Sequence, residues 1–314
     1  MRSATGCALA MRIDEGEGRM NSNLRYPAAS VEEVRRRGEG TQSEGWAQVA
    51  ISVIERALVV LLAVAAILFL FLPILVVVPM SFSSAQSLTF PPPGFSLRWY
   101  GAFFTDPAWL NALWNSLLIA SISSALALAM GTAAAYALVR GRFAGRWAME
   151  ANFMAPLVLP SIILAIALYI AFARTGLLGS YTAVIIAHTL HSVPYVVILM
   201  SVAISSFDRR IEDAARTLGA SDRLVFLRVL LPNVMPSIAA VGILVFIVSF
   251  DEVILTIFLF GTNSTIPKLM FNRLELQVDP TITAIATLLI LFTVVALGCV
   301  ALLTRHSGLL LRRF

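Results

Sequence analysis

Two adjacent acidic residues interrupt a long apolar stretch of the sequence. Asp251 and Glu252 stand within residues 234–260, which carry no other charge. An acid in the middle of a membrane helix costs about 2.5–3.5 kcal/mol to insert, so such a pair needs a function or a partner. A carboxylate beside a solute pathway attracts cations and repels anions. We expect one acid to face a pathway; an ion pair with Lys268 or Arg273, or a capped helix end, is the alternative.

Other reactive groups are sparse. His188 and His191 are three residues apart and share a helix face, where hydrogen-bonded packing is favoured over a proton relay or a ligand role. Cys7 and Cys299 lie in regions that cannot meet, and the sequence predicts no disulfide, no metal site and no cofactor. The single lysine follows Pro267, so the Gly-Lys-Ser/Thr end of a phosphate-binding loop is absent and the chain is not itself an ATPase of that type.

The stretch over residues 208–232 reads DRRIEDAARTLGASDRLVFLRVLLP and predicts two short helices. Asp208 can cap the first helix, and Gly219 can end it. Ser221 can cap the second helix, which Pro232 is expected to end. On the first helix, one apolar face with small members is formed by Ile211, Ala214, Ala215 and Leu218.

The elements that carry these residues are predicted from composition. The chain is 59% hydrophobic and only 13% charged, whereas soluble domains carry about 25% charged residues. A helix crosses the bilayer with about 20 apolar residues, and its backbone must be satisfied internally. The sequence therefore predicts an all-α polytopic membrane protein with six spans, at residues 57–82, 108–139, 151–173, 181–207, 234–260 and 281–304.

The basic residues predict the orientation of these spans. Nineteen of the 23 Lys and Arg residues fall in the first 56 residues, in the 140–150 and 208–232 loops, and in the final residues. Basic loops stay on the cytoplasmic side. Both termini are therefore expected in the cytoplasm, and this distribution argues against nucleic-acid binding as the reason for the net charge of +5.

The polar first part of the chain differs from the rest. Residues 1–50 are rich in Gly, Glu and Arg and are expected to form a disordered or weakly helical cytoplasmic extension, with a helix lying on anionic lipid as the alternative. They show no secretory signal. The start codon stays open among Met1, Met11 and Met20. Residues 51–314 are expected to form the six-span domain.

The 208–232 loop resembles the signature of permease subunits of binding-protein-dependent ABC importers of the type I fold. That signature is Glu-Ala-Ala, three residues, Gly, nine residues, Ile, one residue, Leu-Pro. Here the loop reads Asp213-Ala214-Ala215, three residues, Gly219, nine residues, Val229, one residue, Leu231-Pro232. Asp replaces Glu, and the adjacent Glu212 can supply the longer carboxylate.

The resemblance covers roughly residues 55–304 and implies roles for this loop. It would be the coupling helix that sits in a groove of a separate ATPase subunit. The residues implied in that contact are Glu212, Asp213, Ala214, Ala215, Gly219 and Pro232.

Further motifs resemble the second permease of spermidine/putrescine-type importers: Ser249-Phe250-Asp251-Glu252-Val253, Ile266-Pro267-Lys268 and Asp279-Pro280. This resemblance implies Ser249, Asp251 and Glu252 as pathway residues and a polyamine or related cationic solute. It also implies two ATPase copies, a second and different permease, an extracellular or periplasmic solute-binding protein, and a bacterial inner membrane.

Two other classes remain open from the sequence. A secondary transporter driven by an ion gradient would not need the 208–232 hairpin. A structural or scaffolding membrane protein would not need paired acids in a span.

Overall fold

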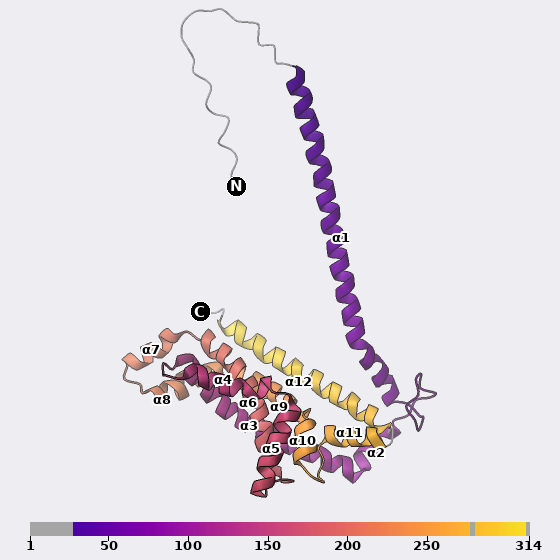
Figure 1. The fold of residues 1–314 in the computed structure, drawn as a ribbon, viewed down its shortest axis with the longest axis vertical. Helices are drawn as coiled ribbons and strands as arrows, with labels where there is room; N and C mark the ends of the chain where they lie inside the picture. The colour runs from indigo at the N-terminus through magenta and orange to yellow at the C-terminus, as the bar shows by residue number, and fades with distance from the viewer. Residues whose placement is uncertain (1–27, 277–279, 312–314) are drawn as a thin grey trace, which may run out of the picture. The chain divides into compact units, whose positions relative to one another are not determined.

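The computed structural model describes residues 28–276 and 280–311, and their regular structure is helical, as the sequence predicts. In chain order (Figure 1), the elements are α1 (Ala28–Ser81), α2 (Arg98–Thr105), α3 (Pro107–Arg140), α4 (Arg146–Val158), α5 (Ser161–Thr175), α6 (Tyr181–Ser206), α7 (Arg209–Thr217), α8 (Asp222–Leu224), the π-helical turn η1 (Val225–Leu230), α9 (Leu231–Phe250), α10 (Ile254–Leu259), α11 (Ile266–Leu276) and α12 (Thr281–Leu311).

Five helical segments in the described residues are long and apolar enough to cross a membrane, and α4 with α5 makes a sixth if the pair is one span. The prediction of six spans is confirmed on this count. The single segments are Val53–Ser81, Pro107–Arg140, Tyr181–Ser206, Asp222–Phe250 and Thr281–Leu302.

The third predicted span is not one straight helix, as the 151–173 assignment had it. α4 and α5 are bent by 104° at residues 159 and 160. Leu159 is extended, with φ −77° and ψ 134°, because a residue before proline is pushed out of the helical region. Pro160 also lacks the N–H that would continue the helical hydrogen bonds. Pro194 and Pro236 lie inside α6 and α9, which continue through them.

Helix α1 extends further back than expected. Residues 28–50 are helical, whereas residues 1–27 of the extension lie outside the described residues. Glu, Arg and Ala are good helix formers, and a helix already nucleated by an apolar span adds residues at low cost. Internal contacts divide the chain within α1, into residues 1–71 and 72–314.

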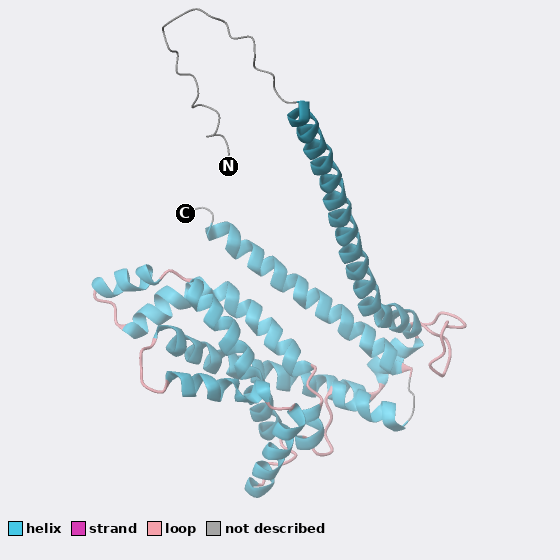
Figure 2. Ribbon diagram, turned by 45° about the horizontal axis from the view of Figure 1, so that its top comes forward, coloured by secondary structure: helices cyan, strands magenta, loops and turns pink. Residues whose placement is uncertain are grey.

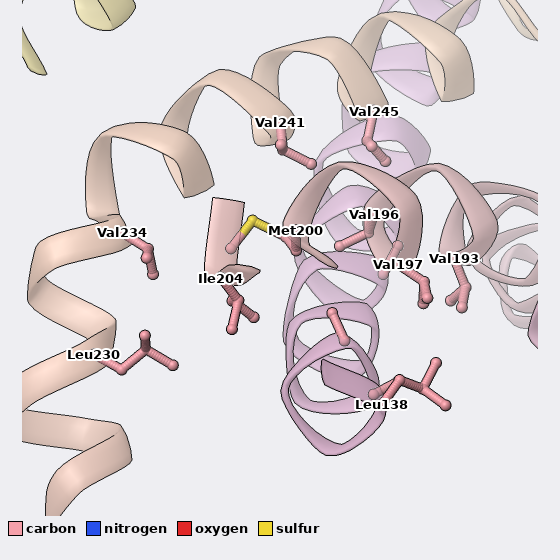
Figure 3. Packing of buried hydrophobic residues seen from close by; sticks show 13 residues of the cluster. Leu138, Val193, Val196, Val197, Met200, Ile204, Leu230, Val234, Val241 and Val245 are labelled. Atoms are coloured by element: carbon pink, nitrogen blue, oxygen red, sulfur yellow. The ribbon is translucent and has the colours of Figure 1, made fainter. Parts of the chain in front are cut away.

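The second unit is built around α3, α6 and the η1–α9 segment (Figure 3). α6 contributes a buried row that includes Val196, Met200 and Ile204, and Leu138 of α3 and Val241 of α9 lie in the same cluster. Interior side chains pack as densely as in organic crystals, so small residues set how closely these helices approach.

The polar helices lie at the two ends of this unit. α7 and α8 form a hairpin at one end, and α2 and α11 lie at the other (Figures 1 and 2). The long helices α3, α6, α9 and α12 run between these ends. These helices can therefore carry a displacement from the hairpin toward the far end.

The close approach of α3 and α6 gives the first testable prediction. A Cβ on Gly131 would lie 2.6 Å from the Cβ and Cγ1 atoms of Val196. Gly131→Ala should therefore force the helices apart, and overpacking of this kind costs about 1–3 kcal/mol. We expect a thermal unfolding midpoint several degrees lower in detergent. Gly298→Ala, where a Cβ meets open space, is the control; equal midpoints for the two variants would contradict the prediction.

Candidate functional site

Helix α7 has the ends that the sequence predicts. The Asp208 side chain accepts a hydrogen bond from the Arg210 N–H at 2.9 Å. Gly219 has φ +89°, in the left-handed region that glycine adopts without strain. Its N–H donates to the Arg216 carbonyl and that of Ala220 to the Ala215 carbonyl, which closes the helix.

The apolar face of α7 points away from the rest of the unit. Ile211 is 50% exposed, Leu218 is 89% exposed and Ala214 is exposed as well, while Ala215 is half-buried. Two exposed aliphatic side chains beside a small residue form a surface against which another protein can pack closely. The predicted face is thus present and open.

An ion-pair network fixes the turn between α7 and α8. The Arg216 guanidinium lies 2.9 Å from Asp222 and 2.8 Å from Asp213. Its hydrogen bond with Asp222, together with the one to Asp213, raises the pKa of Arg216. Asp213 is largely exposed on this network, so its carboxylate is within reach of a partner.

Glu212 does not lie on the outer surface, which corrects its assignment to the contact with an ATPase subunit. Its side chain is wholly buried and accepts from Arg140 Nε at 2.9 Å. In a helix, Glu212 and Asp213 are rotated by about 100°, so only one of them can face outward. The outward position belongs to Asp213.

The second half of the loop also differs from the prediction. Pro232 does not end a helix, because Asp222–Phe250 is one continuous helical segment. The π-helical turn η1 lies directly before it, and the Leu231 N–H donates to the carbonyl of Phe226, five residues back. A wider turn avoids the clash that a proline ring makes with the carbonyl four residues earlier. The Asn233 side chain donates to the Val229 carbonyl at 2.6 Å.

The acids stand at a helix break rather than inside a helix, which corrects the fifth span. α9 ends at Phe250, Asp251 is its C-terminal cap, and α10 begins at Ile254. Asp251 and Glu252 therefore do not point in directions set by one common helix axis.

A buried hydrogen-bonded chain holds the two sides of this break together. His188 Nδ1 lies 2.9 Å from Ser249 Oγ, and His188 Nε2 lies 3.1 Å from Thr256 Oγ1. Ser249 Oγ is also 2.8 Å from Ser123 Oγ of α3. The packing role preferred for His188 is confirmed. Ser249 is 2% exposed, so it supports the break and does not itself line an open surface.

The Glu252 side chain has partners within the protein. One oxygen accepts from the Leu255 N–H at 3.1 Å and thereby caps α10. The other lies 3.5 Å from His191 Nε2 of α6. The alternative of a capped helix end therefore applies to Glu252, with His191 beside it. Lys268 instead donates to the carbonyls of Gly261 and Asn263, and burial lowers its pKa.

Asp251 has a different environment. It is exposed, and within residues 28–276 and 280–311 no side chain donates a hydrogen bond to its carboxylate. It lines a cavity of about 400 Å³ whose walls are otherwise mostly apolar and include Ile247, Phe250, Leu289, Ile290 and Phe292.

Sequence reasoning missed three supporting residues. Arg140 was counted only as a basic loop residue, although it binds Glu212. Ser123 and Thr256 read as ordinary small polar residues, although both join the chain around Ser249. A serine or an arginine at a helix end is a weak signal alone, and only the fold brings these partners together.

A helical membrane chain with an exposed hairpin between two spans and a free acid at a helix break has the features of a transport subunit. The model of the family described as "Binding-protein-dependent transport system inner membrane component" matches residues 125–307. The chain belongs to this family. It is therefore a permease subunit of an ABC importer in the inner membrane, and neither an enzyme nor a secondary transporter. Membership implies an ATPase and a binding protein as partners.

Relatives agree with this assignment. The chain is 36% identical to the putrescine transport system permease protein PotI of Escherichia coli over 234 residues, 71% of this chain and 82% of that one. It is 29% identical to the spermidine/putrescine transport system permease protein PotC of Haemophilus influenzae over 242 residues, 76% and 93% of the two chains. In fold it is similar to a bacterial ABC transporter involved in alginate import, with a TM-score of 0.63, 19% identity, and 79% and 95% of the chains covered.

The different environments of Glu252 and Asp251 can be tested through the thermal unfolding midpoints of variants. Glu252→Ala removes the cap of α10 and the contact with His191, and loss of a helix cap costs about 1 kcal/mol. We expect a clearly lower thermal unfolding midpoint for the purified chain. Asp251→Ala should leave the midpoint unchanged, because no described side chain donates to that carboxylate. The reverse order of the two midpoints would contradict the assignment.

Proposed function

We propose that this chain forms half of the membrane pathway of a polyamine importer and that Asp251 binds a passing ammonium group. The observation that carries the proposal is the free Asp251 carboxylate in a cavity with apolar walls. A polyamine combines ammonium groups with methylene chains, which match a carboxylate and apolar side chains respectively. The relatives PotI and PotC are permeases of a putrescine and of a spermidine/putrescine transport system, which supports this choice.

In this proposal Glu252 and Ser249 serve the pathway indirectly. Both keep the break at residues 251–253 in one geometry, through His191 and His188 respectively. Asp251 is thus the residue that meets the solute.

We further propose that α7 is the coupling helix. Its exposed face of Ile211, Ala214 and Leu218 would pack into a groove of the ATPase subunit, with Asp213 at the edge of the contact. Gly219 and Pro232 would support that contact through the backbone: Gly219 turns the chain at the end of α7, and Pro232 follows the π-helical turn.

We propose the remaining partners on the basis of the importer class. Two ATPase copies would bind from the cytoplasm, and a second, different permease would supply the other half of the pathway. A solute-binding protein would dock on the opposite side. The distribution of basic residues supports this arrangement, with both termini in the cytoplasm.

Uptake of labelled putrescine by the assembled importer in vesicles tests the role of Asp251. Asp251→Asn should lower uptake at subsaturating putrescine about tenfold, which corresponds to about 1.4 kcal/mol of lost binding. Asp251→Glu should recover part of it, because the charge returns. Glu275→Gln, at an exposed acid of α11, is the matched control. Unchanged uptake by Asp251→Asn would exclude Asp251 from the pathway.

Co-purification with the ATPase tests the role of α7. Ala214→Arg adds bulk and charge to the outward face at little cost in helix propensity. We expect at least a tenfold loss of ATPase recovered with the permease. Ala144→Arg, at an exposed alanine of the connection between α3 and α4, should leave the recovery unchanged. Equal recovery with both variants would contradict the proposal.

A further inference from the structure

One acidic side chain of α7 is buried although the helix is otherwise on the surface. Glu212 is 0% exposed, while each other residue of Arg209–Thr217 is exposed or half-buried. A buried carboxylate is stable only with charged or hydrogen-bonding partners. The partner of Glu212 therefore decides what α7 is attached to.

The nearest partner is Arg140, the last residue of α3, whereas Arg216 of α7 itself lies 3.7 Å from Glu212 Oε2. The Nε and Nη2 atoms of Arg140 lie 2.9 and 2.8 Å from Glu212 Oε1. Nη2 also donates to the carbonyls of Ile204 and Phe207, each at 2.9 Å. These carbonyls belong to the C-terminal end of α6. One guanidinium thus joins α3, α6 and α7 in a fixed geometry, since its donors form a planar fork.

The three long helices that leave this end of the unit differ in stiffness. α6 contains Pro194, and α9 contains Pro236 and follows the π-helical turn. Prolines and π-turns are the usual places where helices bend. In α3 the residues from Ala108 to Arg140 include no proline. α3 is therefore the stiffest of the three.

α3 also leads to the helix break. Ser123 of α3 is hydrogen-bonded to Ser249, two residues before Asp251. Further along α3, the Asn115 side chain donates to the Ser264 carbonyl at 2.9 Å, and Ser116 accepts from the Ile266 N–H at 2.8 Å. Contacts of α3 therefore run from α7 to both sides of the segment that carries Asp251.

We propose that Arg140 and Glu212 are positioning residues for energy coupling, which latch α7 to α3 so that movement of α7 reaches the break at Asp251 through α3. This inference rests on the proposed role of α7 as coupling helix and adds a second route to the backbone connections with α6 and α9. Without the latch, a push on α7 would bend the flanking segments instead of shifting α3.

The experiment measures solute imported per ATP hydrolysed by the full importer in vesicles, using labelled putrescine. The variants are Glu212→Gln and Arg140→Lys. Each keeps a polar side chain of similar length but loses the paired guanidinium–carboxylate contact. Arg142→Lys, at an exposed arginine two residues away, is the matched control. We expect both variants to retain the ATPase and to import at least fivefold less solute per ATP, with the control unchanged.

An unchanged ratio in both variants would overturn the proposal, even if total uptake fell with the amount of assembled complex. A purely structural pair would lower assembly and leave the ratio of import to hydrolysis intact.

A double variant decides the case in which the single variants do not assemble. Arg140→Met with Glu212→Leu removes both charges, and apolar replacement of a buried ion pair is often tolerated. Assembly with a lowered ratio would support the latch. Assembly with a normal ratio, or no assembly, would overturn it. A further result would be that Ala214→Arg loses the bound ATPase subunit while the Arg140 and Glu212 variants import a normal amount of solute per ATP. That result would keep α7 as the coupling helix and exclude only the latch.

Discussion

Everything around the helix break depends on the satisfaction of polar groups that lipid cannot solvate. A helix can end in an apolar region only where other groups take over its free hydrogen-bonding atoms. Here Ser249 and Thr256, on the two sides of the break, are joined through His188 of α6. Ser123 adds α3 to the same chain. The break between α9 and α10 is thus held by two other helices and does not depend on its own short turn.

This support separates two acids that the sequence presents as equivalent. Both oxygens of Glu252 lie near donors, the Leu255 N–H and His191. Asp251 lines a cavity, and no described side chain donates a hydrogen bond to its carboxylate. The Glu252 carboxylate accepts one hydrogen bond and has His191 beside its other oxygen, so it has little left to offer a solute. A carboxylate with no described side-chain donor, next to apolar side chains, attracts a cation more strongly than one in bulk water. Because the contacts of Glu252 hold the backbone of the break, Asp251 is not needed to stabilise it.

The sequence predicted features set by local physics and missed those set by tertiary partners. Long apolar runs require spans, and Asp208 and Gly219 act on their own backbone, so all three were predictable. Pro160 stands at a helix break while Pro194 lies inside a continuous helix, so the presence of a proline alone does not predict a break. The Glu212 side chain is buried against Arg140, which is 72 residues away in the sequence. No local sequence pattern predicts this contact. The number of predicted spans agrees with the structure when the bent pair α4–α5 is counted as one span, and two of the predicted spans contain breaks.

A charged latch suits a joint that must keep its orientation while it moves. Apolar side chains can slide past one another with little loss of contact, since dispersion forces have weak directional preference. The pair of Arg140 and Glu212 is different, because hydrogen bonds weaken steeply away from their preferred angles and a parted buried pair leaves two unpaired charges. Rotation of α7 relative to α3 is therefore costly, whereas movement of both together is not. A transport subunit that converts a push at one end into a shift near Asp251 needs this combination.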